Sequence, residues 1–337
     1  MHEIYLLGVI QSKSEKGVVD AVRTRKLALT EGITAGVFFG TAAIFIKFLK
    51  NLDAFYIAFW RLIIACVILA IILFVLRKSF NFNIVRKNLK ELLILSIFLA
   101  LHFIFFTYAV KDTTILNATV LVNTTPIFSM FVSAFLFNIK PSRLAIVGLT
   151  ISFLGVCVIA YAETTITNAN AYPEGFSVSL KGDLEAVLAA LVEAFYLNYG
   201  RKIRKQMTIL PTMFPIYVLT ATIVGVLGMP VTNKILALPT EAEIILPLVG
   251  LGILPTAMAH TLYFSSLSNL KSFETATMAL LEPIGATVLG IILFQEQPAP
   301  VFILGAVLIV LGIFFIARRK MKAFEFDETN KKGTSGY

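Results

Sequence analysis

Ten long apolar segments divide this chain, and they constrain its fold more than any other feature. They span residues 28–49, 54–76, 90–110, 114–137, 143–162, 182–200, 210–229, 242–267, 273–294 and 299–317. A helix needs about 20 residues to cross the hydrocarbon core of a bilayer. Backbone amides in lipid must be hydrogen-bonded within the protein, and an α-helix achieves this within a single segment. The segments therefore predict an all-α integral membrane protein with ten transmembrane helices.

Composition excludes the soluble classes. The chain has 337 residues, of which 58% are hydrophobic and 15% are charged, whereas an ordinary soluble domain has about 45–50% and about 25%. Ten spans use about 200 residues, which leaves no room for a large soluble domain. The net charge of +9 is attributed to basic loops that orient helices in the lipid bilayer. No nucleic-acid partner is expected.

Lysines and arginines gather in alternate loops. The N-terminal tail and the loops after the second, fourth, sixth, eighth and tenth segments hold most of them, and Arg201, Lys202, Arg204 and Lys205 follow the sixth. Loops facing the cytoplasm carry an excess of basic residues. We therefore predict a multi-pass plasma-membrane protein with both termini in the cytoplasm.

The second half of the chain repeats part of the first. Identical residues recur 157 positions apart in the pairs Pro126 and Pro283, Phe137 and Phe294, Pro141 and Pro298, Gly148 and Gly305, and Gly155 and Gly312. Each half contains five segments, and five is odd, so the second half enters the membrane inverted. Inverted repeats place a substrate site near the midplane, between the halves. The repeat indicates alternating access, although a duplication retained in a channel or receptor is the alternative.

These features predict five regions. They are a cytoplasmic tail at 1–26, a first five-helix repeat at 27–162, an external linker at 163–181, a second five-helix repeat at 182–318 and a cytoplasmic tail at 319–337.

Several motifs resemble a known family. The first segment carries Gly32, Gly36 and Gly40, and the second contains Phe59-Trp60-Arg61. The fourth and ninth each contain a proline, and the second repeat has Leu293-Phe294-Gln295-Glu296-Gln297-Pro298 after its fourth segment. Over 28–318 the chain resembles the EamA type of the drug/metabolite transporter superfamily. Ile139 replaces Glu296 in the first repeat, so that glutamate is not essential in both halves.

The resemblance implies a secondary transporter that exports amino acids or related metabolites. Relatives of that family carry nucleotide sugars or sugar phosphates, and an exchanger of such anions is the alternative. No cofactor is implied.

Two glutamates lie near the predicted membrane midplane. Glu193 is eleven residues into its segment and Glu282 is nine residues into its own, and a helix rises 1.5 Å per residue. Asn123, Thr124 and Thr125 lie at a similar depth. A carboxylate would bind the ammonium group of a zwitterion, and an amide or hydroxyl would bind its carboxylate. A carboxyl group held in an apolar setting can also take up a proton, while hydrogen bonding between helices is the alternative role.

Aromatic residues and histidines supply further candidates. Tyr196 and Tyr263 lie near the midplane and are predicted to line the substrate pocket, with ordinary packing as the alternative. His102 and His260 are single histidines on apolar helices, which favours a structural role over a proton relay.

Two basic residues are candidate gates or anion contacts. Arg61 lies about two turns from the outer end of the second segment, and Lys47 lies near the outer end of the first. The alternative for both is that their charged ends reach the lipid headgroups.

Prolines and glycines predict local geometry. Pro126 and Pro283 lack an amide hydrogen, so each is expected to kink its helix and free a carbonyl beside the polar residues. Gly32, Gly36 and Gly40 form one small-residue face. That face is expected to pack between the two halves or in a homodimer.

Other functional classes lack their motifs. The five aspartates lie in predicted tails, loops or helix ends, and no zinc-spaced His/Glu pair, GxSxG or Walker A sequence is present. No metal site is therefore expected, and an intramembrane enzyme or a channel is disfavoured. The predicted function is secondary-active export of a small polar metabolite, foremost an amino acid, by proton coupling, exchange or facilitated movement.

Overall fold

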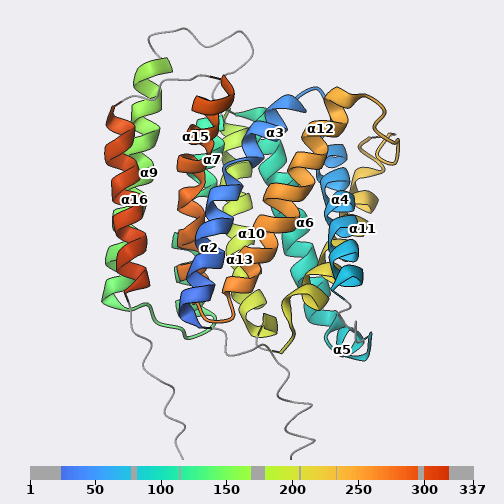
Figure 1. Cartoon of the computed structure of the whole chain (residues 1–337), viewed down its shortest axis with the longest axis horizontal. Coiled ribbons are helices and arrows are strands. Elements are labelled where there is room, and N and C mark those ends of the chain that lie inside the picture. The colour runs from blue at the N-terminus through green and yellow to red at the C-terminus, as the bar shows by residue number, and fades with distance from the viewer. Residues whose placement is uncertain are drawn as a thin grey trace, which may run out of the picture.

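The computed structural model describes residues 24–76, 82–113, 115–167, 179–204, 206–232, 234–294 and 300–318. Helices make up all of the regular secondary structure within these ranges. Figure 1 shows most of them running roughly parallel to one another as a bundle.

The described residues of the first half form eight helices. They are α2 (Arg25–Phe39), α3 (Ala42–Phe48), α4 (Ala54–Val75), α5 (Phe82–Lys87), α6 (Leu89–Asp112), α7 (Ile115–Val122), α8 (Thr125–Phe135) and α9 (Arg143–Thr167). The second half contains α10 (Leu180–Arg204), α11 (Ile209–Gly228), α12 (Ala242–Leu251), the π-helix η1 (Gly252–His260), α13 (Thr261–Ser266), α14 (Ser272–Met278), the 3₁₀ turn η2 (Ala279–Leu281), α15 (Glu282–Phe294) and α16 (Val301–Ala317).

Each of the ten predicted segments is helical, and several are interrupted. Among the described residues, seven continuous or nearly continuous helices are long and apolar enough to cross a membrane. The chain is therefore a multi-pass membrane protein. The other three predicted spans correspond to the charged α10, to the ninth segment, which η2 divides, and to α16, which has 17 residues. The short helix α5 was not predicted.

The two halves interlock through their first helices. Helix α2 packs mainly against η1, α13, η2 and α15 of the second half, and α10 packs mainly against α6, α7 and α8 of the first. Glycines make the first of these contacts close. A Cβ atom at Gly40 would lie 2.5 Å from the backbone nitrogen of Ala286, and one at Gly285 would lie 2.5 Å from the carbonyl oxygen of Val37. The predicted glycine face thus packs between the halves.

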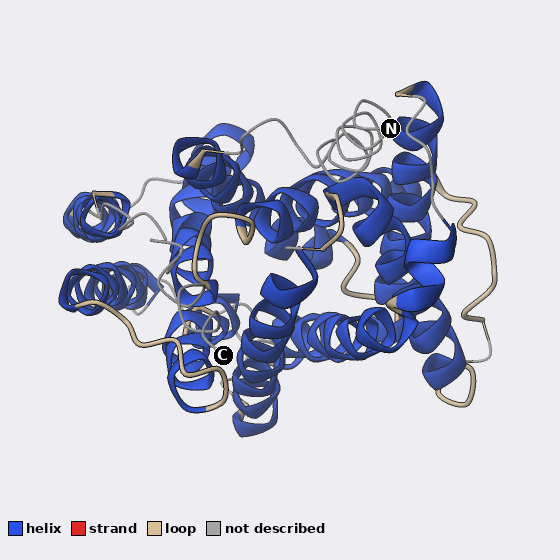
Figure 2. Cartoon of the chain, turned by 90° about the horizontal axis from the view of Figure 1, so that it is seen from below, coloured by secondary structure: helices blue, strands red, loops and turns tan. Residues whose placement is uncertain are grey.

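Helices α9 and α16 form a separate antiparallel pair, which lies at one side of the bundle in Figures 1 and 2. A Cβ at Gly148 would lie 2.6 Å from the carbonyl oxygen of Gly312, and one at Gly155 would lie 2.6 Å from that of Gly305. These contacts are reciprocal under the 157-residue repeat. Equivalent helices therefore run in opposite directions about a pseudo-twofold axis, which is the relation expected of an inverted repeat.

The described chain begins and ends on one face. The Nη2 atom of Arg25, at the start of α2, donates a hydrogen bond to the carbonyl oxygen of Ile316, near the end of α16, at 2.9 Å. The predicted tails fall largely outside the described residues, which begin at 24 and end at 318. Of the predicted linker 163–181, α9 includes the first part and residues 168–178 lie outside the described ranges.

Candidate functional site

Two helices are broken at equivalent positions. Helix α7 ends at Val122 and α8 begins at Thr125, while the turn η2 separates α14 from α15, which begins at Glu282. The starting residues Thr125 and Glu282 are 157 positions apart. Pro126 and Pro283 are the second residues of the new helices, where a missing amide hydrogen costs nothing. Breaks in corresponding helices of an inverted repeat indicate a binding site.

A third irregularity lies in the eighth predicted span. The π-helix η1 includes Pro255 and joins α12 to α13. Thr256 in this helix donates to the carbonyl oxygen of Leu251 at 2.6 Å and accepts from Arg61 Nε at 2.9 Å. The bond from Arg61 links the second predicted span to the eighth. Short π-helical turns often occur at functional sites.

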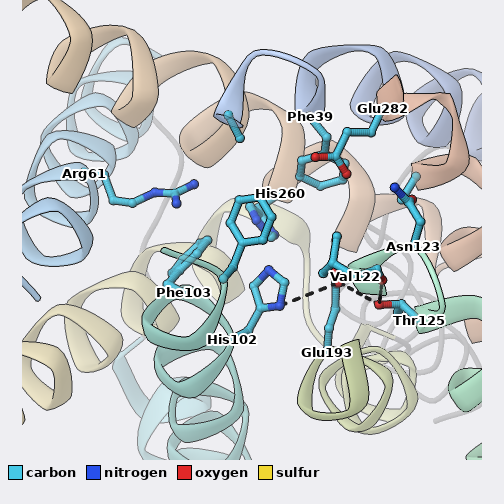
Figure 3. A pocket seen from close by; sticks show the side chains of 13 residues that line it. Phe39, Arg61, His102, Phe103, Val122, Asn123, Thr125, Glu193, His260 and Glu282 are labelled. Atoms are coloured by element: carbon cyan, nitrogen blue, oxygen red, sulfur yellow. Dashed lines mark hydrogen bonds and ion pairs between the residues drawn. The ribbon is translucent and has the colours of Figure 1, made fainter. Parts of the chain in front are cut away.

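A cavity lies between the two halves at the level of these breaks (Figure 3). Its lining residues are Phe39, Ala42, Arg61, His102, Phe103, Phe106, Val122, Asn123, Thr125, Glu193, His260, Ala279 and Glu282. Seven of the ten predicted spans contribute to it. About 30 Å³ inside is free for water-sized molecules, which is enough for about two waters.

The cavity lies on the pseudo-twofold axis. Equivalent residues from the two halves line it in the pairs Phe103 and His260, Val122 and Ala279, and Thr125 and Glu282, all 157 positions apart. The first helices of the two halves align at an offset of 154, which places Glu31 on Glu185 and adds the pair Phe39 and Glu193. In three pairs the ionisable member comes from the second half. The halves therefore share a backbone frame and differ in the chemistry that they present to the cavity.

Two carboxyl groups form one end of the cavity. Glu193 and Glu282 are each 6% exposed. Thr125 Oγ1 donates to Glu193 Oε2 at 3.2 Å. Asn123 lines the cavity with Glu282, and its Nδ2 atom donates to the carbonyl oxygen of Thr119 at 2.7 Å. Within the described part of the chain, no lysine or arginine forms an ion pair with either carboxyl group. This end can therefore bind a cation.

An arginine forms the other end. Arg61 is 1% exposed, and its guanidinium carbon lies 4.2 Å from the centre of the Phe103 ring. Its Nη1 atom is buried and has no hydrogen-bond partner among the described residues. Figure 3 shows Arg61 entering from the side opposite Asn123, Thr125 and Glu282. A buried cation without a paired anion is costly, so this end is suited to an anionic group.

Two histidines that the sequence favoured as structural line the cavity. His102 Nδ1 lies 3.1 Å from the carbonyl oxygen of Ala189 and 3.7 Å from Glu193 Oε2. His260 is held between aromatic rings, and its Nδ1 atom has no partner among the described residues. The available sequence signal was that His260 lies one repeat length after Phe103, but the repeat alone did not indicate a cavity.

The remaining predicted site residues lie elsewhere. Tyr196 and Tyr263 are fully buried outside the cavity lining, where Tyr196 contacts Phe264 and Tyr263 contacts Phe39. Thr124 lies at the break between α7 and α8 and donates to a backbone carbonyl. Lys47 is exposed near the end of α3. The structure therefore brings together Asn123, Thr125, Glu193, Glu282 and Arg61, but not the others.

Comparison with known proteins gives the family. The model of the EamA-like transporter family matches residues 27–161 and 180–318. The chain belongs to the EamA-like transporter family. The two matched stretches correspond to the two repeats, and membership supports a non-enzymatic membrane transporter.

Similar proteins have been named only as transporters. An uncharacterized transporter of Archaeoglobus fulgidus is 26% identical over 306 residues, covering 87% of this chain and 96% of the relative. The uncharacterized transporter YoaV of Bacillus subtilis is 25% identical, covering 77% and 87%. A solved crystal structure has a TM-score of 0.69 at 19% identity, covering 87% of this chain and 96% of that one. That likeness shows the fold alone.

Proposed function

We propose that this EamA-like transporter exports an amino acid or a closely related metabolite across the plasma membrane by secondary-active alternating access. The observation that carries the proposal is the cavity on the pseudo-twofold axis, with carboxyl groups at one end and an unpaired arginine at the other. An inverted repeat can open such a site to each side of the membrane in turn.

The charges of the cavity fit a zwitterion. The ammonium group binds between Glu193 and Glu282, where Thr125 donates to Glu193 and Asn123 also lines the cavity. The substrate carboxylate binds Arg61 Nη1. Phe39, Phe103 and Phe106 supply an apolar wall for the substrate side chain. Tyr196 and Tyr263 reach the substrate only in a conformation that opens this wall.

Transport requires the cavity to widen, because its free volume of about 30 Å³ is far below that of an amino acid. Widening is easiest where helices are already interrupted, since the breaks before Thr125 and Glu282 leave fewer helical hydrogen bonds to disrupt. Pro126 and Pro283 are the proposed hinge points. Helix α2 packs on α15, and α10 packs on α8. Movement at the two prolines shifts the first pair of helices away from the second.

Export is proposed to be coupled to protons. A proton and the substrate ammonium compete for the carboxyl groups of Glu193 and Glu282, so protons entering from outside displace the substrate. The sidedness follows from the basic loops, which favour cytoplasmic termini. Lys47 lies on the outer side in this orientation and is proposed to attract anions toward the open cavity.

A phosphate-bearing substrate is the second candidate. The unpaired Nη1 of Arg61 would accept a phosphate as readily as a carboxylate. Glu193 and Glu282 line the same cavity and would repel a dianion, which favours the zwitterion.

Counterflow into proteoliposomes tests the proposal. Labelled amino acids are assayed at pH 6 and pH 8 with the purified full-length protein. Exchange of an amino acid that depends on Glu282 supports the zwitterion. Exchange of sugar phosphates or nucleotide sugars, without exchange of amino acids, would replace it with the second candidate.

A further inference from the structure

We propose that His260 is a second contact for the substrate carboxylate, beside Arg61, and that it makes the transporter selective for metabolites that carry this group. The inference rests on the proposed function and assigns a binding role to a residue for which the sequence favoured a structural one.

His260 lines the cavity and has one side-chain nitrogen that makes no hydrogen bond within the described residues. The residue is 3% exposed, and that nitrogen is Nδ1. Buried polar atoms of native proteins are nearly always paired, so an unpaired one needs an explanation. A ligand group that bonds to Nδ1 during transport provides that explanation.

Aromatic rings fix the position of the imidazole. The His260 ring meets those of Phe39 and Phe103 edge-on, with centroids 4.8 Å apart in both cases. It also meets the His102 ring at 5.8 Å. These contacts hold His260 in one orientation without using its nitrogen Nδ1. A donor that is held in place before the ligand arrives loses little entropy on binding.

Arg61 and His260 are positioned by the same ring. The Arg61 guanidinium lies over the face of Phe103 at 4.2 Å, and His260 contacts that ring at 4.8 Å. Each has a buried nitrogen without a partner among the described residues. A carboxylate has two oxygens, so it can accept from Arg61 Nη1 and from His260 Nδ1–H together.

The neighbouring groups favour a carboxylate over an ammonium at this position. The charged guanidinium of Arg61 and the imidazole of His102 act on His260 electrostatically. An ammonium group would be repelled by Arg61, whereas a carboxylate is attracted. The carboxyl groups that suit an ammonium lie at the other end, near Thr125 and Asn123.

His102 does not serve the same purpose. Its Nδ1 atom is already within hydrogen-bond distance of the Ala189 carbonyl oxygen and lies near Glu193. The two histidines therefore differ in that only the Nδ1 atom of His260 lacks a partner within the described chain. Selectivity follows because an amine leaves both Arg61 Nη1 and His260 Nδ1 unpaired, and an amide offers one neutral oxygen where a carboxylate offers two that share a negative charge. A site that loses such bonds rejects the analogue.

The test compares matched ligands on matched variants. The ligands are L-leucine, L-leucinamide and 3-methylbutylamine, with the corresponding phenylalanine series, and only the amino acids carry a carboxylate. Binding is measured as the concentration that half-maximally stabilises the detergent-purified protein against heat, and transport is measured by counterflow. The variants are H260F, which keeps an aromatic ring, H260N, which keeps an NH donor near the position of Nδ1, and H260Q, which moves that donor outward.

A control variant removes a similar atom outside the site. Ser268 also has a buried side-chain oxygen without a partner among the described residues, but it does not line the cavity. S268A is therefore expected to bind each ligand as the wild type does.

The expected result is a loss that depends on the carboxylate. H260F and H260Q raise the half-maximal concentration for the amino acid about ten-fold or more, and H260N retains most of the affinity. The loss for the amide is smaller, because its neutral oxygen accepts a weaker bond, and binding of the amine does not change. If H260F does not fold, the H260N and H260Q pair decides the same question.

Two results would overturn the role of His260 while leaving the proposed function in place. One is wild-type protein that exchanges amino acids but binds leucinamide as tightly as leucine. The other is an equal loss for leucine and leucinamide in H260Q or H260F. Absence of exchange and binding for all amino acids would overturn the proposed function and this inference together.

Discussion

Thr125 and Glu282 occupy equivalent positions in the two halves and begin the two helices, α8 and α15, that resume after a break. Both side chains line the cavity. The Thr125 hydroxyl donates to Glu193 at 3.2 Å. Equivalent positions thus carry a hydrogen-bond donor in the first half and a carboxyl group in the second.

Replacing Glu282 by glutamine should impair transport without unfolding the protein. The amide has nearly the same shape and its oxygen can still accept hydrogen bonds, but it cannot bind an ammonium group as an anion. We expect exchange in counterflow to fall about ten-fold or more, with little change in expression or thermal unfolding. The matched control is E185Q, since Glu185 is paired with Lys181 away from the cavity. Wild-type exchange by E282Q would remove Glu282 from the mechanism.

Replacing Arg61 by methionine should abolish transport while leaving the stability of the protein nearly unchanged. The change removes a buried cation that no carboxylate neutralises in the described chain, and Thr256 Oγ1 keeps its bond to Leu251. Losing the contact between the guanidinium and the Phe103 ring destabilises the fold, whereas removing a buried charge stabilises it. Because the two effects oppose each other, the free energy of unfolding should change by no more than about 1 kcal/mol. Counterflow of amino acids should be lost.

Thermal unfolding and counterflow on the same R61M preparation provide the check. A large destabilisation would mean that Arg61 has a structural role. Unchanged exchange in a stable variant would show that the substrate does not bind Arg61.

Replacing Gly40 by alanine should disturb the contact between the halves. The added Cβ would lie 2.5 Å from the Ala286 backbone nitrogen and 2.7 Å from the Glu282 carbonyl oxygen. Backbone atoms cannot move aside cheaply, so we expect a destabilisation of about 1–3 kcal/mol and slower exchange. In the control G225A, the nearest neighbour is an edge atom of the Phe59 ring at 3.1 Å, and its effect should be smaller. Thermal unfolding of G40A and G225A is the measurement. Equal destabilisation of the two variants would contradict a close contact between the halves at Gly40.

Amino-acid binding should weaken as the pH falls. Protons and the substrate ammonium compete for Glu193 and Glu282, so the half-maximal concentration for exchange should rise between pH 8 and pH 6. The pH dependence should become flatter in E282Q and E193Q and should persist in E185Q. A wild-type profile that is flat with pH would leave exchange or facilitated movement as the mechanism.

Much of the fold was readable from local sequence. Helix α4, for example, follows from an uninterrupted apolar run after the capping residue Asp53, whose carboxylate accepts from the Phe55 amide. The repeat identified Pro126 and Pro283 as equivalent. Glu193, Glu282 and Arg61 were recognisable because an ionisable residue in an apolar helix is costly and therefore conspicuous.

The cavity wall was not readable in the same way. Phe39 and Phe103 are ordinary residues among 29 phenylalanines, and Tyr196 and Tyr263 had the same expected depth as the residues that line the cavity. Which side of a helix faces the axis depends on its rotation against neighbours. Helices α2 and α10 pack mainly against the opposite halves, a long-range exchange that no local pattern encodes.

The sequence by itself determined the membrane class, the helical segments and the duplicated halves, because hydrophobic length, loop charge and repeated residues can all be read from the linear order of residues without knowing which of them touch. Only the tertiary structure decided that Arg61 and His260 meet on the ring of Phe103. That meeting depends on the rotation of α4, α6 and η1 about their own axes. The packing of glycines such as Gly40 against distant backbone limits how closely and at what angle the helices can approach.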